Sequence, residues 1–166
     1  MKRIFILAFF SSLLFIQKIQ AQFEGTFGLG VHAGYGAEIN NLGGGIHLHF
    51  YRTNNFRFAP SFTYFLENKK ENMWMTDLDA HYILPVSYSA SLYPIAGLHY
   101  SHWKYDTSKR DVQTEENWTK NRLGANLGLG FQHDIGYRIR ANFELKYQFI
   151  KDFSQVFFSA GIGFWF

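Results

Sequence analysis

The stretch YRIRANFELKYQF, residues 137–149, alternates apolar and polar side chains over thirteen positions without a break. The alternation resumes in VFFSAGIGFWF, residues 156–166, where glycines and Ser159 stand between the apolar side chains. Successive side chains of a β-strand point to opposite faces, so each stretch predicts a strand with one apolar face. A soluble sheet rarely finishes on Gly-Phe-Trp-Phe, whereas a membrane barrel can, because its outer face meets lipid.

The first residues differ from the rest of the chain. Residues 1–21 combine a basic start at Lys2 and Arg3, an apolar run of thirteen residues and a small residue, Ala21. This pattern predicts a secretory signal peptide, and its apolar run is too short to cross a bilayer as a helix. Residues 22–166 are then one domain. The absence of cysteine excludes a lipoprotein anchor, disulfides and thiolate metal sites.

Charge and composition narrow the class further. Removing Lys2, Arg3 and Lys18 with the signal peptide leaves 13 of the 16 basic residues, against 13 acidic ones. A nucleic-acid partner is therefore not expected, because no basic excess remains. The chain is 20% aromatic and contains 15 glycines. An aromatic-rich, glycine-rich and alternating sequence is typical of a transmembrane β-barrel.

Six further alternating segments precede residue 137, at about 27–35, 42–51, 56–64, 77–84, 91–105 and 122–132. With the two final strands they predict an all-β fold, an eight-stranded antiparallel transmembrane up-and-down β-barrel. In the fifth segment the outward side chains are expected to be Leu92, Ala96, Leu98 and Tyr100. The size of the side chains decides which face is inside. Phe, Tyr and Leu would overfill an eight-stranded interior, so the apolar face should meet lipid rather than line a lipocalin-like cavity.

The connections predict an orientation. Residues 52–55, 86–89 and 133–136 form short turns, whereas residues 67–72 and 106–121 form longer, charged loops. Outer-membrane barrels have short periplasmic turns and longer outside loops, so both termini should be periplasmic. Pro60 and Pro94 lie inside predicted strands. We expect a β-bulge at each, because a closed barrel has no free edge where a missing N–H is harmless.

These features resemble the small outer-membrane β-barrel family that includes the OmpA membrane domain and OmpX. The resemblance covers essentially all of residues 22–166 and implies the barrel fold, the bacterial outer membrane and porin-like relatives, but no single activity. It also implies that the final strand is the signal read by the barrel-assembly machinery during insertion. The signal residues are Phe158, Ile162, Phe164 and Phe166.

Eight charged side chains are expected inside the barrel: Arg57, Asp77, Asp79, Arg122, Arg138, Arg140, Glu144 and Lys146. Isolated buried charges are costly, so they should pair. We predict a cross-lumen network whose cations are Arg138 or Arg140, with Arg57 as a further partner. Its anions are Asp77 and Asp79. Such a network either plugs and stiffens the barrel or forms a charged constriction that passes small solutes.

Other motifs carry less weight. Gly28 to Ala33 fits the dinucleotide pattern G-x-G-x-x-A, but the strand alternation continues through it where a helix should open, so no cofactor is expected. A metal site would need three or four histidines to converge, and we expect His32, His47, His49, His81 and His99 to be hydrogen-bonded polar filler. No catalytic grouping stands out, so an enzyme is not expected.

The sequence therefore predicts a structural or surface-interaction barrel in the outer membrane. A small, low-conductance passive pore is the alternative. An extracellular partner would contact the loops at 67–72 and 106–121.

Overall fold

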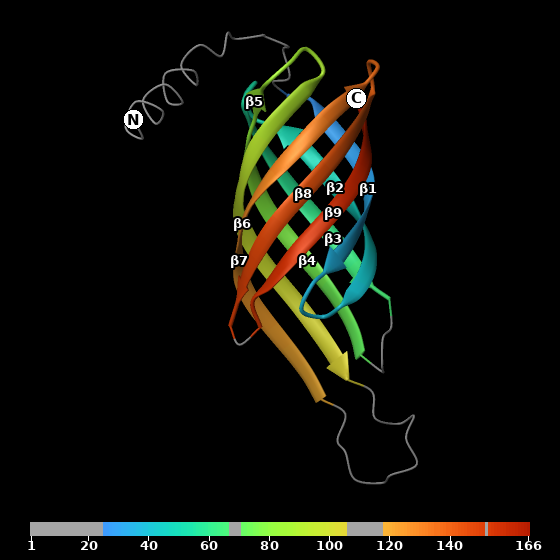
Figure 1. The fold of residues 1–166 in the computed structure, drawn as a ribbon, viewed down its shortest axis with the longest axis vertical. Coiled ribbons are helices and arrows are strands. Elements are labelled where there is room, and N and C mark those ends of the chain that lie inside the picture. Colours follow the sequence, from blue (N-terminus) through green and yellow to red (C-terminus); the bar gives the residue numbers. More distant parts are fainter. Residues whose placement is uncertain (1–24, 67–70, 106–117, 152) are drawn as a thin grey trace, which may run out of the picture.

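The structure, a computed structural model, describes residues 25–66, 71–105, 118–151 and 153–166. They form a single closed sheet (Figure 1). Its strands are β1 (Phe27–Gly36), β2 (Asn41–Tyr51), β3 (Phe56–Phe65), β4 (Glu71–Tyr82), β5 (Leu84–Pro85), β6 (Ala90–Tyr105), β7 (Trp118–Ile135), β8 (Ile139–Ile150) and β9 (Gln155–Trp165). Within these residues, no helix has the length and apolar character to cross a bilayer. The predicted signal peptide, residues 1–21, lies outside the described part.

Every strand pairs antiparallel with its neighbours in the order β4-β3-β2-β1-β9-β8-β7-β6-β5, and β4 pairs with β6 to close the ring. The pairs of β4 and β5 with β6 share one continuous register, so β5 is the end of the fourth barrel strand. The structure thus confirms the eight-stranded antiparallel barrel. The seam between β1 and β9 runs from Gly28 opposite Trp165 to Gly36 opposite Phe157.

The alternation of the sequence becomes an outer and an inner face. In β8, Phe143, Leu145 and Tyr147 are exposed, whereas Asn142, Lys146 and Gln148 are buried. In β6, Leu92 and Leu98 are exposed and Tyr93 is buried, so the predicted phase of the fifth strand is confirmed. The glycine motif at Gly28 lies within β1 and opens no helix.

The prediction of β-bulges at the two prolines is wrong. Pro60 pairs with Leu78 of β4, and Pro94 pairs with Leu129 of β7, with no extra residue in either register. Each proline instead interrupts the pairing with the strand on its other side, which is β2 for Pro60 and the fourth barrel strand for Pro94. Beside Pro94 the fourth strand is interrupted at Ile83, which keeps its pairing toward β3: its N–H donates to the carbonyl of Asn55, and its own carbonyl accepts from Asn55 Nδ2.

The two ends of the barrel differ. The start of β1 and the C-terminus lie at one end, here the termini end, together with the turns at 52–55, 86–89 and 136–138 (Figure 1). The opposite end, here the loop end, receives the connections after β3 and β6. Residues 67–70 and 106–117 of these connections lie outside the described part. β4 already begins at Glu71 and β7 at Trp118, so the predicted loops at 67–72 and 106–121 extend too far into the strands.

Candidate functional site

An ionic cluster occupies the middle of the lumen. Lys146 Nζ of β8 donates hydrogen bonds of 2.8 Å to Asp77 Oδ2 and of 2.8 Å to Asp79 Oδ2, both on β4. The three side chains are at most 3% exposed. The other carboxylate oxygens also have partners: Asp77 Oδ1 lies 2.7 Å from His99 Nδ1, and Asp79 Oδ1 accepts from Asn126 at 2.9 Å. The cluster is therefore a closed set of charge-assisted hydrogen bonds across the barrel.

Two features of the strands position this cluster: the alternation of side-chain direction and the glycines that face the charged side chains. Asp77 and Asp79 are two residues apart, so both point inward from β4. Their neighbours leave room: Gly97 stands opposite Asp79, and Gly128 stands opposite Lys146. A Cβ at Gly97 would collide with the Asp79 carboxylate, and one at Gly128 would lie 2.9 Å from Lys146 Cα. Small inward residues thus make space for the long charged side chains.

Arg57 lies between the ionic cluster and the termini end and is fully buried. Its Nε donates to His81 Nδ1 at 3.0 Å, and its Nη1 donates to Gln132 Oε1 at 2.7 Å. The guanidinium also lies 4.5 Å from the centre of the Tyr93 ring. Tyr93 in turn donates its hydroxyl to Glu144 Oε1 at 3.0 Å. Arg57 and Glu144 therefore belong to one polar group linked through Tyr93.

Arg140 makes a separate ionic contact. Its guanidinium donates to both carboxylate oxygens of Asp134, its neighbour on β7, and to the Tyr51 hydroxyl at 2.8 Å. It also lies 4.2 Å from the centre of the Trp165 ring. The pair sits at the termini end, where β7 and β8 meet at their hairpin turn.

The predicted network is therefore only partly assembled. Asp77 and Asp79 do meet a cation across the lumen, but it is Lys146 and neither Arg140 nor Arg57. Arg138 was wrongly placed inside: it is exposed in the turn 136–138 and lies 5.8 Å from the ring centre of the outward Phe164. The turn needs the positive φ of Gly136, 77°, so regular strand geometry begins only at Ile139. Arg122 is half-buried over the Trp103 and Phe153 rings.

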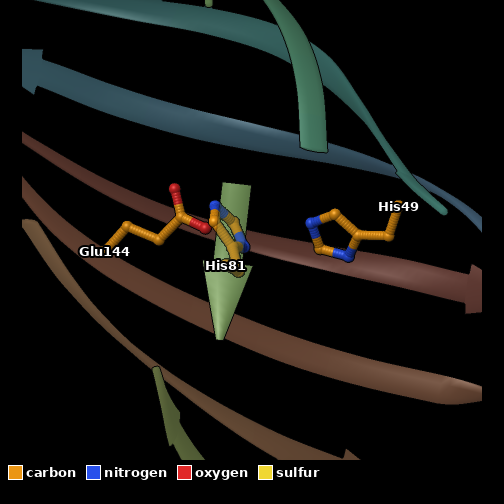
Figure 2. Close-up of side chains that lie close together, drawn as sticks. All are labelled: His49, His81 and Glu144. Carbon is orange, nitrogen blue, oxygen red and sulfur yellow. The ribbon is translucent and has the colours of Figure 1, made fainter. Parts of the chain in front are cut away.

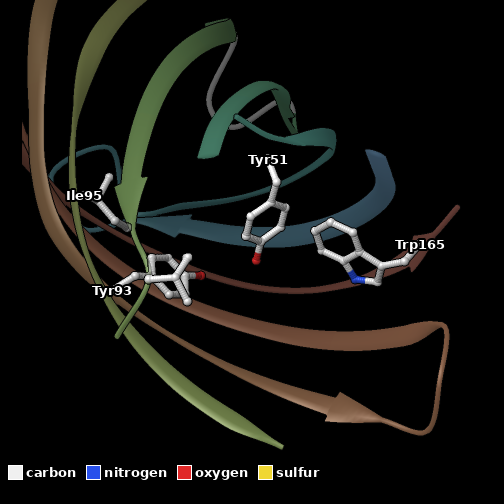
Figure 3. Close-up of a cluster of buried hydrophobic side chains, with 5 residues drawn as sticks. Tyr51, Tyr93, Ile95 and Trp165 are labelled. Carbon is white, nitrogen blue, oxygen red and sulfur yellow. The ribbon is translucent and has the colours of Figure 1, made fainter. Parts of the chain in front are cut away.

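Two clusters of aromatic and aliphatic side chains fill the lumen on either side of the ionic cluster, one toward each end of the barrel. The sequence analysis did not predict them. The termini-end cluster contains Tyr51, Ile83, Tyr93, Ile95 and Trp165 (Figure 3). The loop-end cluster contains Phe65, Met73, Met75, Trp103 and Phe157. The signal for them was present in strand parity, since each residue stands at an inward position near the end of its strand. This signal did not lead to a prediction, because large side chains were expected to overfill an eight-stranded interior.

Between the clusters lies a small cavity of about 20 Å³, next to the ionic cluster. Four histidines line it: His32, His47, His49 and His81. Glu144 of β8 borders the same cavity, and ligand atoms of His49, His81 and Glu144 all lie within 4.8 Å of one another (Figure 2). His99 is not part of this wall and contacts Asp77 instead. These three side chains are the described residues whose arrangement suits a metal ion.

The four residues of the predicted assembly signal lie on the outer face of β9. Phe158, Ile162 and Phe164 are 46%, 48% and 39% exposed, and Phe166 is 73% exposed. Phe166 closes the seam, because its N–H donates to the carbonyl of Phe27 at 3.0 Å. Its ring lies 5.2 Å from that of Phe164.

Comparisons with known proteins agree with this architecture. A family model described as outer membrane protein beta-barrel domain matches residues 12–166. No curated protein matches the sequence. Solved structures similar to the chain include the N-terminal β-barrel domain of Pseudomonas aeruginosa OprF, with a TM-score of 0.71 and 17% identity over 86% of this chain and 98% of that one.

Two further solved structures are similar. Neisserial surface protein A, NspA, has a TM-score of 0.65 and 14% identity over 84% of this chain and 95% of that one. Ail, the attachment invasion locus protein of Yersinia pestis, has a TM-score of 0.63 and 15% identity over 86% of this chain and 99% of that one. At these identities the likeness shows the fold alone.

Proposed function

Because the chain belongs to the outer membrane protein beta-barrel domain family, we propose that it acts as a closed structural or surface-interaction barrel. The family implies a Gram-negative outer membrane with lipid around the exposed apolar face. The proposed role is non-catalytic. The observation that carries it is the buried cluster of Lys146, Asp77 and Asp79, which occupies the centre of the lumen where a pore would need water.

The filled interior supports this role over the alternative, a low-conductance pore. An ion crosses a pore either with its hydration water or past polar groups that replace that water. Here aromatic clusters lie on both sides of the ionic cluster, and the cavity of about 20 Å³ has room for roughly one water molecule. The proposed role of such a rigid barrel is to hold the connections at its loop end in place for contact with a partner.

Single-channel recording on the purified, refolded barrel tests the proposal. We expect no well-defined openings in a planar bilayer. Folding is verified beforehand by the shifted mobility of the unboiled protein on a gel. An absence of openings then cannot be due to unfolded protein. Frequent, well-defined openings would overturn the closed barrel and establish the pore.

The orientation is part of the proposal. Both termini are proposed to face the periplasm, so that residues 67–70 and 106–117 are outside and available to an extracellular partner. Support comes from the turns of a few residues at the termini end and from the long connection 106–117 at the loop end, where the connections 37–40 and 151–154 are short. An epitope inserted between 106 and 117 should be labelled in intact cells, and one inserted at 86–89 should not. The reverse labelling would contradict this orientation.

We also propose that cleavage after Ala21 releases the barrel, and that Phe158, Ile162, Phe164 and Phe166 guide its insertion by the barrel-assembly machinery. The mass of the mature protein tests the cleavage site. Deleting Phe166 should lower the amount of folded barrel in cells while leaving refolding in detergent intact. Phe149→Ala, which removes an outward aromatic of β8, is the matched control. Wild-type insertion of the deletion variant would refute the signal.

A further inference from the structure

The cavity beside the ionic cluster is bordered by a row of imidazoles. The ring centres of His32 and His47 lie 5.7 Å apart, those of His47 and His49 4.7 Å apart, and those of His49 and His81 6.0 Å apart. The row thus runs from β1 over β2 to β4, and each ring borders the same cavity. Glu144 reaches this cavity from β8 on the opposite wall.

Several polar atoms on this wall have no protein partner among the described residues. They are His47 Nε2, His81 Nε2 and both amide atoms of the Asn142 side chain. His81 is 1% and Asn142 4% exposed, so bulk water does not satisfy them. Buried polar groups are almost always hydrogen-bonded or ligated. The wall of the cavity is therefore built for a polar guest, either water or an ion.

The donor set decides between classes of ion. Two imidazoles and one carboxylate, from His49, His81 and Glu144, offer ligand atoms within 4.8 Å of one another (Figure 2). Imidazole ligands suit zinc, copper and nickel, whereas calcium and magnesium prefer all-oxygen sites. Two histidines, one glutamate and a water form a common four-coordinate zinc set. The cavity has space for that water.

The local charge also favours a cation. Three carboxylates, those of Asp77, Asp79 and Glu144, surround this part of the lumen. The cations beside them are Lys146 and Arg57. One negative charge is therefore left over, and buried charge without a counter-charge is costly. A divalent ion would offset it and leave one net positive charge.

One contact competes with such an ion. Arg57 Nε donates to His81 Nδ1, so the proton of the neutral His81 ring is on Nε2. Binding of a neutral His81 through Nε2 requires that the proton moves to Nδ1, and binding through Nδ1 uses the lone pair that accepts from Arg57, so the Arg57–His81 hydrogen bond breaks in both cases. Arg57 keeps its bond to Gln132 in either case. Metal uptake should therefore be coupled to a small rearrangement of Arg57.

We propose that His49, His81 and Glu144 bind one divalent transition-metal ion of the zinc class inside the barrel, with a water from the cavity as fourth ligand. Tyr93 is a positioning residue, because its hydroxyl holds Glu144 Oε1 and leaves the second carboxylate oxygen for the metal. The site is independent of the proposed surface role, since it is enclosed between the two aromatic clusters.

The test uses tag-free barrel refolded with Co²⁺, because the aromatic clusters bar entry to the folded lumen. We expect one equivalent of Co²⁺ that resists brief treatment with a chelator, with the visible absorption of four-coordinate cobalt. His49→Gln and Glu144→Gln each remove a proposed ligand. Loss of a residue that only supports a ligand typically lowers metal affinity roughly 10–100-fold, so each of these two variants should lower the Co²⁺ affinity by more than that. Tyr93→Phe, which removes only the hydroxyl, should lower it within that range. His102→Gln, on the outer face, is the control and should match the wild type.

A second readout covers variants that fold poorly. Bound metal should raise the unfolding midpoint of the wild-type barrel, and Glu144→Gln, nearly the same size as the native residue, should lose that increase. Two results would overturn the proposal. Absence of cobalt from the refolded wild type would mean that the cavity holds water only. Equal uptake by His49→Gln and His102→Gln would mean adventitious binding at the surface.

Discussion

Strand β8 makes two ionic contacts in the same lumen, and they are built differently. Lys146 reaches across the barrel to two aspartates of β4, and all three side chains are at most 3% exposed. Arg140 contacts Asp134 on the adjacent strand β7, and that carboxylate is 28% exposed. The first contact joins opposite walls, and the second joins neighbours that the register already places side by side.

The difference shows where burial makes a charge indispensable. At Lys146 bulk solvent does not reach the contact, so removing the ammonium leaves two buried carboxylates facing each other. At Asp134 solvent reaches one partner, and Arg140 keeps the Tyr51 hydroxyl and the Trp165 ring. Two contacts of similar chemistry should therefore differ severalfold in what they contribute to stability.

The largest effect is expected for Lys146→Met, which keeps the length of the side chain and removes its charge. Stranding Asp77 and Asp79 should lower the free energy of unfolding by about 3–5 kcal/mol. Urea titration of the barrel in lipid vesicles measures this. Lys104→Met, at an exposed outward position of β6, is the matched control and should change little. An equal, small effect of the two changes would mean a wet lumen and would make the pore the preferred function.

A smaller effect is expected for Asp134→Asn. The asparagine keeps one acceptor for Arg140, and solvent screens the charge that is lost, so the free energy of unfolding should fall by about 1 kcal/mol. The same titration, repeated at high salt, sharpens the comparison. Added salt should reduce the difference between Asp134→Asn and wild type, but leave that of Lys146→Met nearly unchanged. If added salt changed the effects of Asp134→Asn and Lys146→Met equally, the two ionic contacts would not differ in their access to solvent.

The smallest effect is expected for Arg138→Gln. Arg138 is exposed in the turn and contacts the outer face near Phe164. A surface substitution of this kind usually changes stability by less than about 0.5 kcal/mol. A loss comparable to that of Lys146→Met would show that Arg138 turns into the lumen, as the sequence alone had indicated.

Strand parity accounts for what was predictable. Over residues 139–150 the alternation places Lys146 and Arg140 inside and Phe143 and Leu145 outside, because a β-strand leaves each side chain only two directions. The same rule identified eight barrel strands and the phase of β6. It failed at Arg138, since an alternating pattern does not show where a strand stops and a turn begins. A different argument, from the missing proline N–H, failed at Pro60 and Pro94, where the ladder skips pairs instead of bulging.

The sequence by itself determined the class of fold, the lipid-facing surface and most of the side chains that share the lumen, because these follow from local alternation and side-chain size. Which of those side chains meet was decided by the tertiary structure alone. The stagger of strands around the closed ring sets Lys146 level with Asp77 and Asp79, and it brings His49 and His81 to Glu144. Contacts across a barrel depend on the sum of all the strand registers, and no single strand carries that information.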